Sequence, residues 1–242
     1  MKPSTLSKAA AVFTILFSGF ASAQKPSIAA VYTRYEVKPD YQERFRKALA
    51  EYVLQAISND GSIMAEAYHE QDKPNVHWLI ERWNSKKAFE KFSRNFRSKA
   101  LNSFVQKALL VPAEAINVKD LEPISKQEWH KTPKAGESQL TIMLFVKSKQ
   151  GTQQKFREVY KAAMPKFRSE PGVVAYQLSQ FENDDAQFVT YEKFRNEEAF
   201  QYHLDFPPIQ PVIDYLNLDI TNPPFQDSVH RLIEFAPLIR EN

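Results

Sequence analysis

The sequence contains no cysteine among its 242 residues. A disulfide, a thiolate-bound metal and a cysteine nucleophile are therefore excluded. Glycine is scarce as well, with five residues in the whole chain, which leaves little room for the glycine-rich loops that hold nucleotide phosphates. The sequence also lacks a nucleophile-elbow motif and a paired-carboxylate motif. Stability must come from packing, for which a hydrophobic content of 43% is ample.

Long apolar runs are confined to the N-terminus. Residues 1–23 carry Lys2 and Lys8, then an apolar run over residues 9–20, then an Ala-Ser-Ala sequence at 21–23. This pattern is typical of a secretory signal peptide that is cleaved after position 23, because the run is shorter than the roughly 20 residues of a membrane span. We expect a periplasmic or secreted protein with no integral membrane segment once the signal is removed. An uncleaved N-terminal anchor is the alternative.

An excess of charge of either sign is absent too. The chain has 32 Lys and Arg residues against 29 Asp and Glu residues. Removal of the two signal lysines, Lys2 and Lys8, leaves 30 basic against 29 acidic residues. A near-neutral mature chain does not indicate a nucleic-acid partner.

What the chain does contain is an internal repeat. The segment at 186–206 repeats the layout of the segment at 75–96 after a shift of 111 positions. A constant shift over turn, aromatic and charged positions indicates two copies of one module. The matched pairs include Gly61 with Gly172, Glu81 with Glu192, Trp83 with Phe194, Ala88 with Ala199, and Phe89 with Phe200.

Each copy predicts the order β-α-β-β-α-β, with an additional helical segment before the last strand. In the first copy we expect strands at 28–37, 62–70, 76–83 and 115–121, and helices at 40–57, 86–92 and 96–110, the first of them capped by Asp40 and Glu43. In the second copy we expect strands at 140–146, 173–181, 187–194 and 227–235, and helices at 152–167, 197–203 and 209–216. The predicted units are a first module at 28–121, a linker at 122–138 with Trp129 as its large apolar residue, and a second module at 139–236.

The predicted fold class is therefore α+β. Helices would cover one face of each antiparallel sheet, and the other face would stay bare. The simplest cover for that face is the matching face of the second copy. We expect two tandem ferredoxin-like modules packed sheet to sheet as a pseudo-dimeric α+β barrel.

Strand alternation separates the side chains of the third strand of each copy. It places His77, Leu79, Glu81 and Trp83 on one face, and the matching residues Phe188, Thr190, Glu192 and Phe194 in the second copy. Trp83 and Phe194 are expected to pack under the helices, with a substrate wall as the alternative. Glu81 and Glu192 would need partners if buried, and a helix end or the other copy is the expected source.

The end of this strand resembles a known family. A strand closing in Glu-x-Trp or Glu-x-Phe is followed by a polar cap, by Ala-Phe and, three residues later in the second copy, by His203 and a proline-containing bend. This layout resembles the antibiotic biosynthesis monooxygenase (ABM) domain over both copies. The resemblance implies a dimeric α+β barrel. It also implies dioxygen as co-substrate with no flavin, haem or metal cofactor, as in the branches of this family that oxidise quinols or polyketides.

From this resemblance we expect an exported, cofactor-independent monooxygenase that acts on a small quinol or related aromatic compound. His203 is the expected catalytic base, since histidine titrates near neutral pH, and Phe92 replaces it in the first copy. The expected substrate-binding residues are Phe188, Tyr191, Glu192, Phe194 and Trp83.

Other interpretations stay open at this stage. His203 could instead cap its short helix at the surface, and the barrel could be a non-catalytic binding or stress-response module for a hydrophobic molecule. His69 and His77 could approach each other across a hairpin and begin a haem site, although we expect no metal site. His130 falls in the linker, and His230 has no obvious partner. The sequence predicts an intramolecular pseudo-dimer and leaves further pairing of two chains open.

Overall fold

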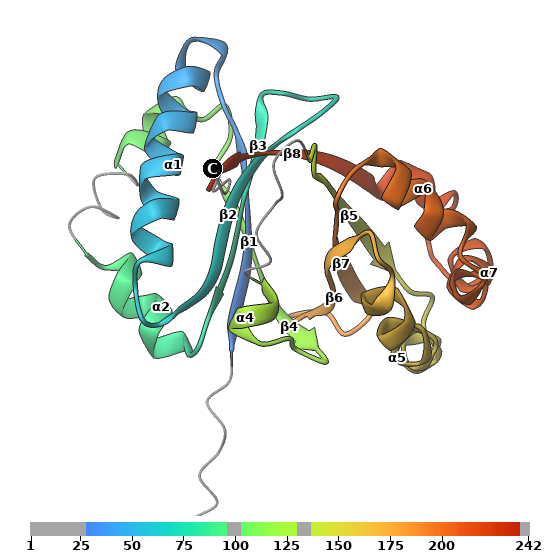
Figure 1. Cartoon of the computed structure of the whole chain (residues 1–242). Coiled ribbons are helices and arrows are strands. Elements are labelled where there is room, and N and C mark those ends of the chain that lie inside the picture. Colours follow the sequence, from blue (N-terminus) through green and yellow to red (C-terminus); the bar gives the residue numbers. More distant parts are fainter. Residues whose placement is uncertain (1–27, 96–102, 130–136, 238–242) are drawn as a thin grey trace, which may run out of the picture.

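The computed structural model describes residues 28–95, 103–129 and 137–237 and shows a closed barrel of eight antiparallel strands with helices on its outside (Figure 1). The predicted signal peptide lies outside the described residues. The first half of the chain supplies β1 (Ala29–Glu36), α1 (Gln42–Ile57), β2 (Ser62–Glu70), β3 (Val76–Trp83), α2 (Lys86–Ser93) and β4 (Glu114–Leu121). The second half supplies β5 (Leu140–Lys147), α5 (Gln153–Ser169), β6 (Val173–Phe181), β7 (Gln187–Phe194), α6 (Glu197–Asp205), α7 (Gln210–Leu218) and β8 (Val229–Ala236).

The barrel is closed by an exchange of last strands between the two halves. Its order is β1-β3-β2-β8-β5-β7-β6-β4, so β4 pairs with β1 of its own half and with β6 of the other. In the same way β8 pairs with β5 and with β2. The predicted tandem α+β barrel is confirmed. Backbone hydrogen bonds therefore join the two halves at two places, between β4 and β6 and between β8 and β2. These bonds satisfy amide and carbonyl groups that an open sheet edge would leave unpaired.

The repeat seen in the sequence is also present in the contacts. The isolated bridge between Val37 and Leu109 recurs, 111 positions later, between Ser148 and Ile220. The last strand of the second half pairs three positions further along than the 111-position shift predicts. Opposite Ala30 lies Val118, whereas opposite the equivalent Thr141 lies Leu232. The two halves are therefore related by approximate two-fold symmetry up to the loop before β8.

The repeated glycines mark a close approach between a turn and a helix. A Cβ atom added to Gly61 would lie 2.7 Å from Cβ of Ala88, and one added to Gly172 would lie 2.3 Å from Cβ of Ala199. The helices at these contacts begin alike, because Ser85 and Asn196 accept a hydrogen bond from the amide of Ala88 and Ala199, respectively. Glycine and alanine recur in both copies since larger side chains would push the helix off the sheet.

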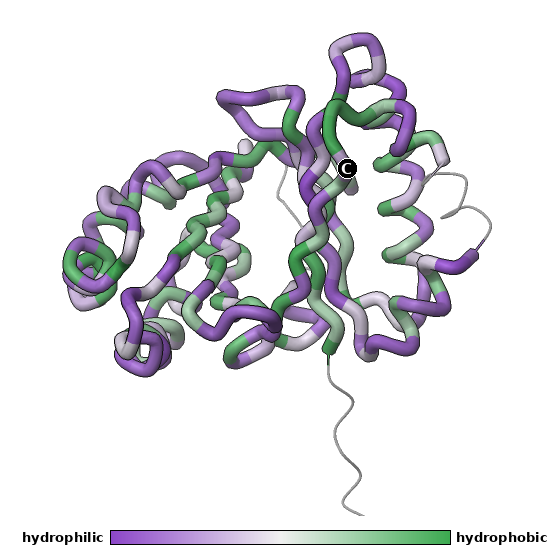
Figure 2. Tube along the Cα trace, turned by 180° about the vertical axis from the view of Figure 1, so that it is seen from behind, coloured by the Kyte–Doolittle hydropathy of each residue, from purple (hydrophilic) through white to green (hydrophobic). Residues whose placement is uncertain are grey.

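The predicted faces of the third strands are confirmed. Leu79 and Trp83 belong to the core beneath α1 and α2, and Phe188 and Phe194 belong to the core beneath α5, α6 and α7. The intervening residues point into the barrel and form a third core. Hydrophobic and hydrophilic residues alternate along the strands and along the helices (Figure 2).

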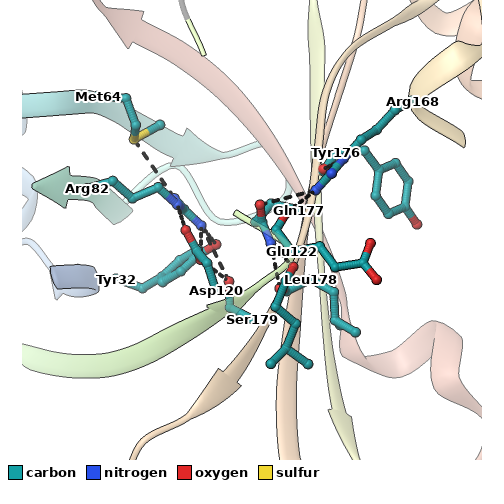
Figure 3. Close-up of polar contacts among 11 residues, drawn as sticks. Tyr32, Met64, Arg82, Asp120, Glu122, Arg168, Tyr176, Gln177, Leu178 and Ser179 are labelled. Atoms are coloured by element: carbon teal, nitrogen blue, oxygen red, sulfur yellow. Dashed lines mark hydrogen bonds and ion pairs between the residues drawn. The ribbon is translucent and has the colours of Figure 1, made fainter. Parts of the chain in front are cut away.

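The barrel interior is more polar than a bare apolar sheet face. Arg82 is buried and donates to Asp120 at 2.7 Å and to Tyr32 at 2.8 Å (Figure 3). In the other half the matching Lys193 lies 3.0 Å from a Glu66 oxygen and 2.6 Å from a Glu234 oxygen. Each buried cation is thus paired with a carboxylate, as burial requires. Glu66 belongs to β2 and Lys193 to β7, so one of these ion pairs joins the two halves.

One local prediction differs from the structure. A short 3-10 turn at Pro39–Tyr41 precedes α1, which begins at Gln42, and Asp40 forms no side-chain cap. The predicted linker contains a short helix, α4 (Lys126–Trp129), whose Trp129 is buried. The Arg82 guanidinium carbon lies 4.4 Å from the centre of the Trp129 ring. Trp129 therefore packs on the polar barrel interior. No helix in the described ranges has the length and apolar content that a membrane span requires.

Candidate functional site

A cavity of about 330 Å³ lies in the second half of the chain, between the sheet and helices α6 and α7. This volume is within the range of pockets for small organic molecules. Its wall is mostly apolar, and His203 and Glu192 are among the polar groups on it. The lining residues are Ile142, Leu144, Tyr160, Tyr176, Glu192, Phe200, His203, Leu204, Ile209, Val212, Ile213, Leu216, Phe225, Gln226, Val229 and Arg231.

His203 lies near the end of α6 and is 1% exposed. Its Nδ1 atom is 2.8 Å from Oε1 of Glu170, which is also buried. The imidazole ring packs against Phe167, with ring centres 4.7 Å apart, and against Phe194 at 5.3 Å. Packing and the carboxyl group therefore hold the ring in one orientation.

The Glu170 contact determines how the imidazole can act. An ionised carboxylate only accepts hydrogen bonds, so Nδ1 carries the proton in this pair. A ring that carries its one proton on Nδ1 has its lone pair on Nε2, and the hydrogen bond to Glu170 uses Nδ1. A histidine oriented in this way can take a proton from a molecule in the cavity.

Glu192 is an acidic group on the cavity wall. It accepts a hydrogen bond of 2.9 Å from the Tyr176 hydroxyl. Burial raises the pKa of the Glu192 carboxyl above its ordinary value, and the nearby His203 opposes part of this increase. Burial also raises the pKa of the Tyr176 hydroxyl well above its ordinary value. Both shifts act against ionisation, and the Tyr176 hydroxyl donates its single proton to Glu192.

The structure separates the residues that we predicted for the site. His203 and Glu192 line the same cavity, and Phe194 packs on the His203 ring. Phe188 lies deeper in the same core, 4.7 Å from the Phe156 ring. Tyr191 faces the barrel interior, and Trp83 lies in the core of the first half.

Sequence reasoning missed the partner of His203. Glu170 lies in a turn signal of Glu, Pro and Gly, and a turn carboxylate attracts no attention by itself. A comparison of the copies contains the missing signal, because Asn59 stands at the position of Glu170 and Phe92 at the position of His203. Both members of the pair change together between the two copies.

The first half has Glu81 at the position of Glu192, but the residues around it differ. Glu81 accepts hydrogen bonds from the Tyr52 hydroxyl at 3.1 Å and from the Trp83 indole at 3.2 Å. Burial raises the pKa of Glu81 to about 7. Phe92 packs against Trp83 with the two rings tilted and their centres 4.8 Å apart. The expected partner for these glutamates, a helix end or the other copy, was therefore wrong: Glu81 and Glu192 are each bonded to a tyrosine of their own half.

The remaining histidines lie apart from this cavity. His69 and His77 do face each other across the hairpin, with ring centres 6.4 Å apart, and burial lowers the pKa of His77 to about 4. Within the described ranges no group of His, Asp and Glu side chains is arranged to hold a metal ion. His230 does have a partner, because its Nδ1 is 3.0 Å from Glu70. His130 lies outside the described residues.

Similar solved structures share this architecture. One named "putative monooxygenase", from Lactobacillus acidophilus NCFM, is 15% identical, covers 86% of this chain and 94% of its own, and has a TM-score of 0.71. Another of the same name, from Fusobacterium nucleatum, is 13% identical, covers 87% and 94%, and has a TM-score of 0.74. An anthrone oxidase-like protein is 10% identical, covers 91% and 98%, and has a TM-score of 0.59. At these identities the likeness concerns the fold alone.

No curated protein sequence matches the chain. The family model described as antibiotic biosynthesis monooxygenase matches twice, at residues 28–102 and 140–213. The two matches together span more than half of the chain, and they fall on the two repeated halves of the barrel. The chain therefore belongs to the antibiotic biosynthesis monooxygenase family, with two copies of its domain in tandem.

Proposed function

We propose that the protein is an exported, cofactor-independent monooxygenase that oxidises a small quinol or anthrone-like aromatic compound in the second module. One observation carries this proposal: His203, whose Nδ1 pairs with Glu170, lines an apolar, aromatic cavity. Family membership and the fold shared with an anthrone oxidase-like protein support the reaction class. The signal-like residues 1–23 support export to the periplasm or the medium.

The reaction begins with proton removal from the substrate. His203 Nε2 takes a proton from an activated methylene or phenol, which leaves an electron-rich aromatic anion. This anion gives one electron to dioxygen, and the resulting radical and superoxide combine through a new carbon–oxygen bond. The peroxide takes the proton back from the imidazolium. Glu170 stabilises the positive ring while it holds that proton.

The second half of the reaction breaks the oxygen–oxygen bond. In an anthrone-like substrate a base removes the remaining hydrogen of the same carbon as a proton, the carbonyl forms, and the outer oxygen leaves as hydroxide and becomes water. One oxygen atom ends in the ketone and the other in water, so the substrate supplies all the electrons. Glu192 lies on the cavity wall, and the burial that raises its pKa suits it to donate a hydrogen bond to the oxyanion of the intermediate, while the Tyr176 hydroxyl holds its carboxyl group in place.

An oxygen-electrode assay with a panel of hydroquinones and anthrones tests the proposal. We expect uptake by the wild type and a loss of about 10²- to 10⁴-fold in His203→Ala, which is the usual contribution of a general base. His230→Ala is the matched control, because His230 also pairs with a glutamate but does not line the cavity. Uptake that is absent in the wild type, or equal in the two variants, refutes the assignment. Tight binding of these compounds without uptake would instead favour a binding module.

A further inference from the structure

Arg231 carries the permanent positive charge of the cavity wall. It lies on β8 and lines the cavity together with His203 and Glu192. It also lines a second, more open groove next to Asn196 and Glu198. The guanidinium group therefore stands between the cavity and the solvent, where an incoming molecule would meet it.

Strand register places Arg231 in line with the proposed reactive groups. Arg231 pairs with Ile142 of β5, and Ile142 pairs with Glu192 of β7. Glu192 in turn pairs with Tyr176 of β6. Neighbouring strands are about 4.8 Å apart, so Arg231 and Glu192 are about 10 Å apart on the same face of the sheet. A flat ring system lying over Ile142 would reach from the His203 end to the guanidinium.

Contacts to both halves orient the guanidinium and leave donors free. The Nε atom donates to Gln71 of the first half at 3.3 Å, and one terminal nitrogen pairs with Glu197. The guanidinium carbon lies 5.5 Å from the Phe200 ring centre. Arginine has five N–H donors, so three remain without a described partner. This pre-orientation suits the two-point binding of a planar carboxylate.

The ion pair with Glu197 does not block such a ligand. The Glu197 side chain is 63% exposed, whereas that of Arg231 is 29% exposed. A carboxylate exposed to this degree adds little stability to the pair. A ligand carboxylate that enters the cavity can therefore replace Glu197 on Arg231, while Glu197 returns to water.

The first half lacks this set of residues. In the equivalent row across its sheet, Asn117 pairs with Val31, Val31 with Glu81, and Glu81 with Ala65. Asn117 therefore takes the place of Arg231, and Ala65 takes the place of Tyr176. The cation occurs in the half that also carries the Glu170–His203 pair.

We propose that Arg231 is a specificity-determining residue that selects aromatic substrates with a carboxylate at the end opposite the reacting group. This inference rests on the proposed function, because only a reaction makes the ligand a substrate. The binding that it predicts can be measured without any reaction. Gln71 and Phe200 position the guanidinium, and the apolar wall over Ile142 receives the rings. The preferred ligand is a fused or linked aromatic acid that spans about 10 Å, the distance set by two strand spacings.

Calorimetric titration with two unreactive probes tests this inference: anthraquinone-2-carboxylate and the uncharged anthraquinone-2-carboxamide. We expect the wild type to bind the carboxylate at least tenfold more tightly, with a preference that decreases as salt is added. Arg231→Gln should lose this preference and keep its carboxamide affinity within about threefold, a mark of intact folding. Arg231→Lys should retain part of the preference, because it keeps the charge but loses the planar fork. Arg157→Gln, an exposed arginine of α5 outside the cavity, is the control.

Equal affinity of the wild type for the two probes overturns the inference, as does an unchanged preference in Arg231→Gln. Failure of the wild type to bind either probe overturns it as well. The outcome is independent of oxygen uptake, because both probes are already oxidised. A carboxylate preference without any oxygenase activity would leave the binding role of Arg231 in place and remove only the proposed reaction.

Discussion

The two buried glutamates near His203, Glu170 and Glu192, have different hydrogen-bond partners. Glu170 is bonded to an imidazole, whereas Glu192 is bonded to a phenol and has a raised pKa. A carboxylate beside a histidine stabilises the protonated ring, and a carboxyl group that keeps its proton can donate to an oxyanion. A glutamate on the cavity wall and a second one bonded to His203 can therefore serve opposite electrostatic roles.

Glu170 is a positioning residue, and Glu170→Gln tests it. The amide keeps the shape of the side chain but removes the charge opposite the imidazolium. We expect kcat for oxygen uptake to fall at least tenfold while KM stays within about threefold, because proton transfer and not binding depends on this charge. Glu158→Gln, on the exposed side of α5, is the control. A rise in KM at unchanged kcat would contradict the positioning role.

Glu81 predicts a pH-dependent stability. Its folded pKa of about 7 exceeds the ordinary value of 4.5, so the folded state binds more protons than the unfolded state between these pH values. Stability therefore decreases as pH rises through this window, by about 3 kcal/mol at 1.36 kcal/mol per pKa unit. Glu81→Gln removes this contribution. Urea denaturation at pH 5, 6, 7 and 8 should show that the free energy of unfolding of the variant increases relative to that of the wild type as pH rises. A constant difference between the two proteins would refute the pKa shift.

At the scale of the elements, the contact between a turn and a helix sets the position of α6. The turn before β6 approaches α6 so closely that Gly172 has no room for a side chain. His203 belongs to α6, and Glu170 precedes Gly172 by two residues. The same contact that packs the helix therefore brings the proposed base to its carboxylate.

Gly172→Ala should lower the free energy of unfolding by about 1–3 kcal/mol, the usual cost of an overpacked contact. Ala199→Gly removes the opposing Cβ atom and by itself costs about 1 kcal/mol in a helix. Because the two atoms would collide, we expect the double variant to lose at least about 1 kcal/mol less than the sum of the single variants. Chemical denaturation of the four proteins measures this coupling. Strict additivity would show that the helix is free to shift.

At the scale of the whole molecule, the two halves form one closed structure. Backbone pairing joins β4 to β6 and β8 to β2, and Lys193 of the second half reaches Glu66 of the first. Each half closes the sheet of the other, so neither is expected to unfold alone. The cavity is confined to the second half, but Gln71 of the first half contacts its Arg231.

Lys193→Met tests the link between the halves. It leaves the buried carboxylates of Glu66 and Glu234 without their cation, and the loss of one partner of a buried pair typically costs about 3–5 kcal/mol. Calorimetry should show one unfolding transition in both proteins, at a lower temperature in the variant. Lys155→Met, which breaks an exposed pair with Asp219, should have a much smaller effect. Two separate transitions, or equal losses in the two variants, would contradict a cooperative barrel.

Much of the site was accessible from the repeat and the strand alternation. These patterns correctly placed Glu192 and Phe194 on the helix-covered face, because alternation is a property of the strand itself. The family pattern drew attention to His203, which does line the cavity. The partners Glu170 and Arg231 could not be predicted in this way, since one lies in a turn and the other on the last strand. Tyr191 was grouped with the site although its alternation already pointed it into the barrel.

The sequence alone determined the two copies, the order of strands and helices in each, and the faces of the third strand of each copy. These features depend on short-range periodicity and on turn residues, which act through neighbours along the chain. The tertiary structure alone decided which polar groups meet. The Glu170–His203 pair, the Arg231 row and the Lys193–Glu66 link each join positions far apart in sequence, and their side chains come together only when the strands pair and the helices pack on the sheet.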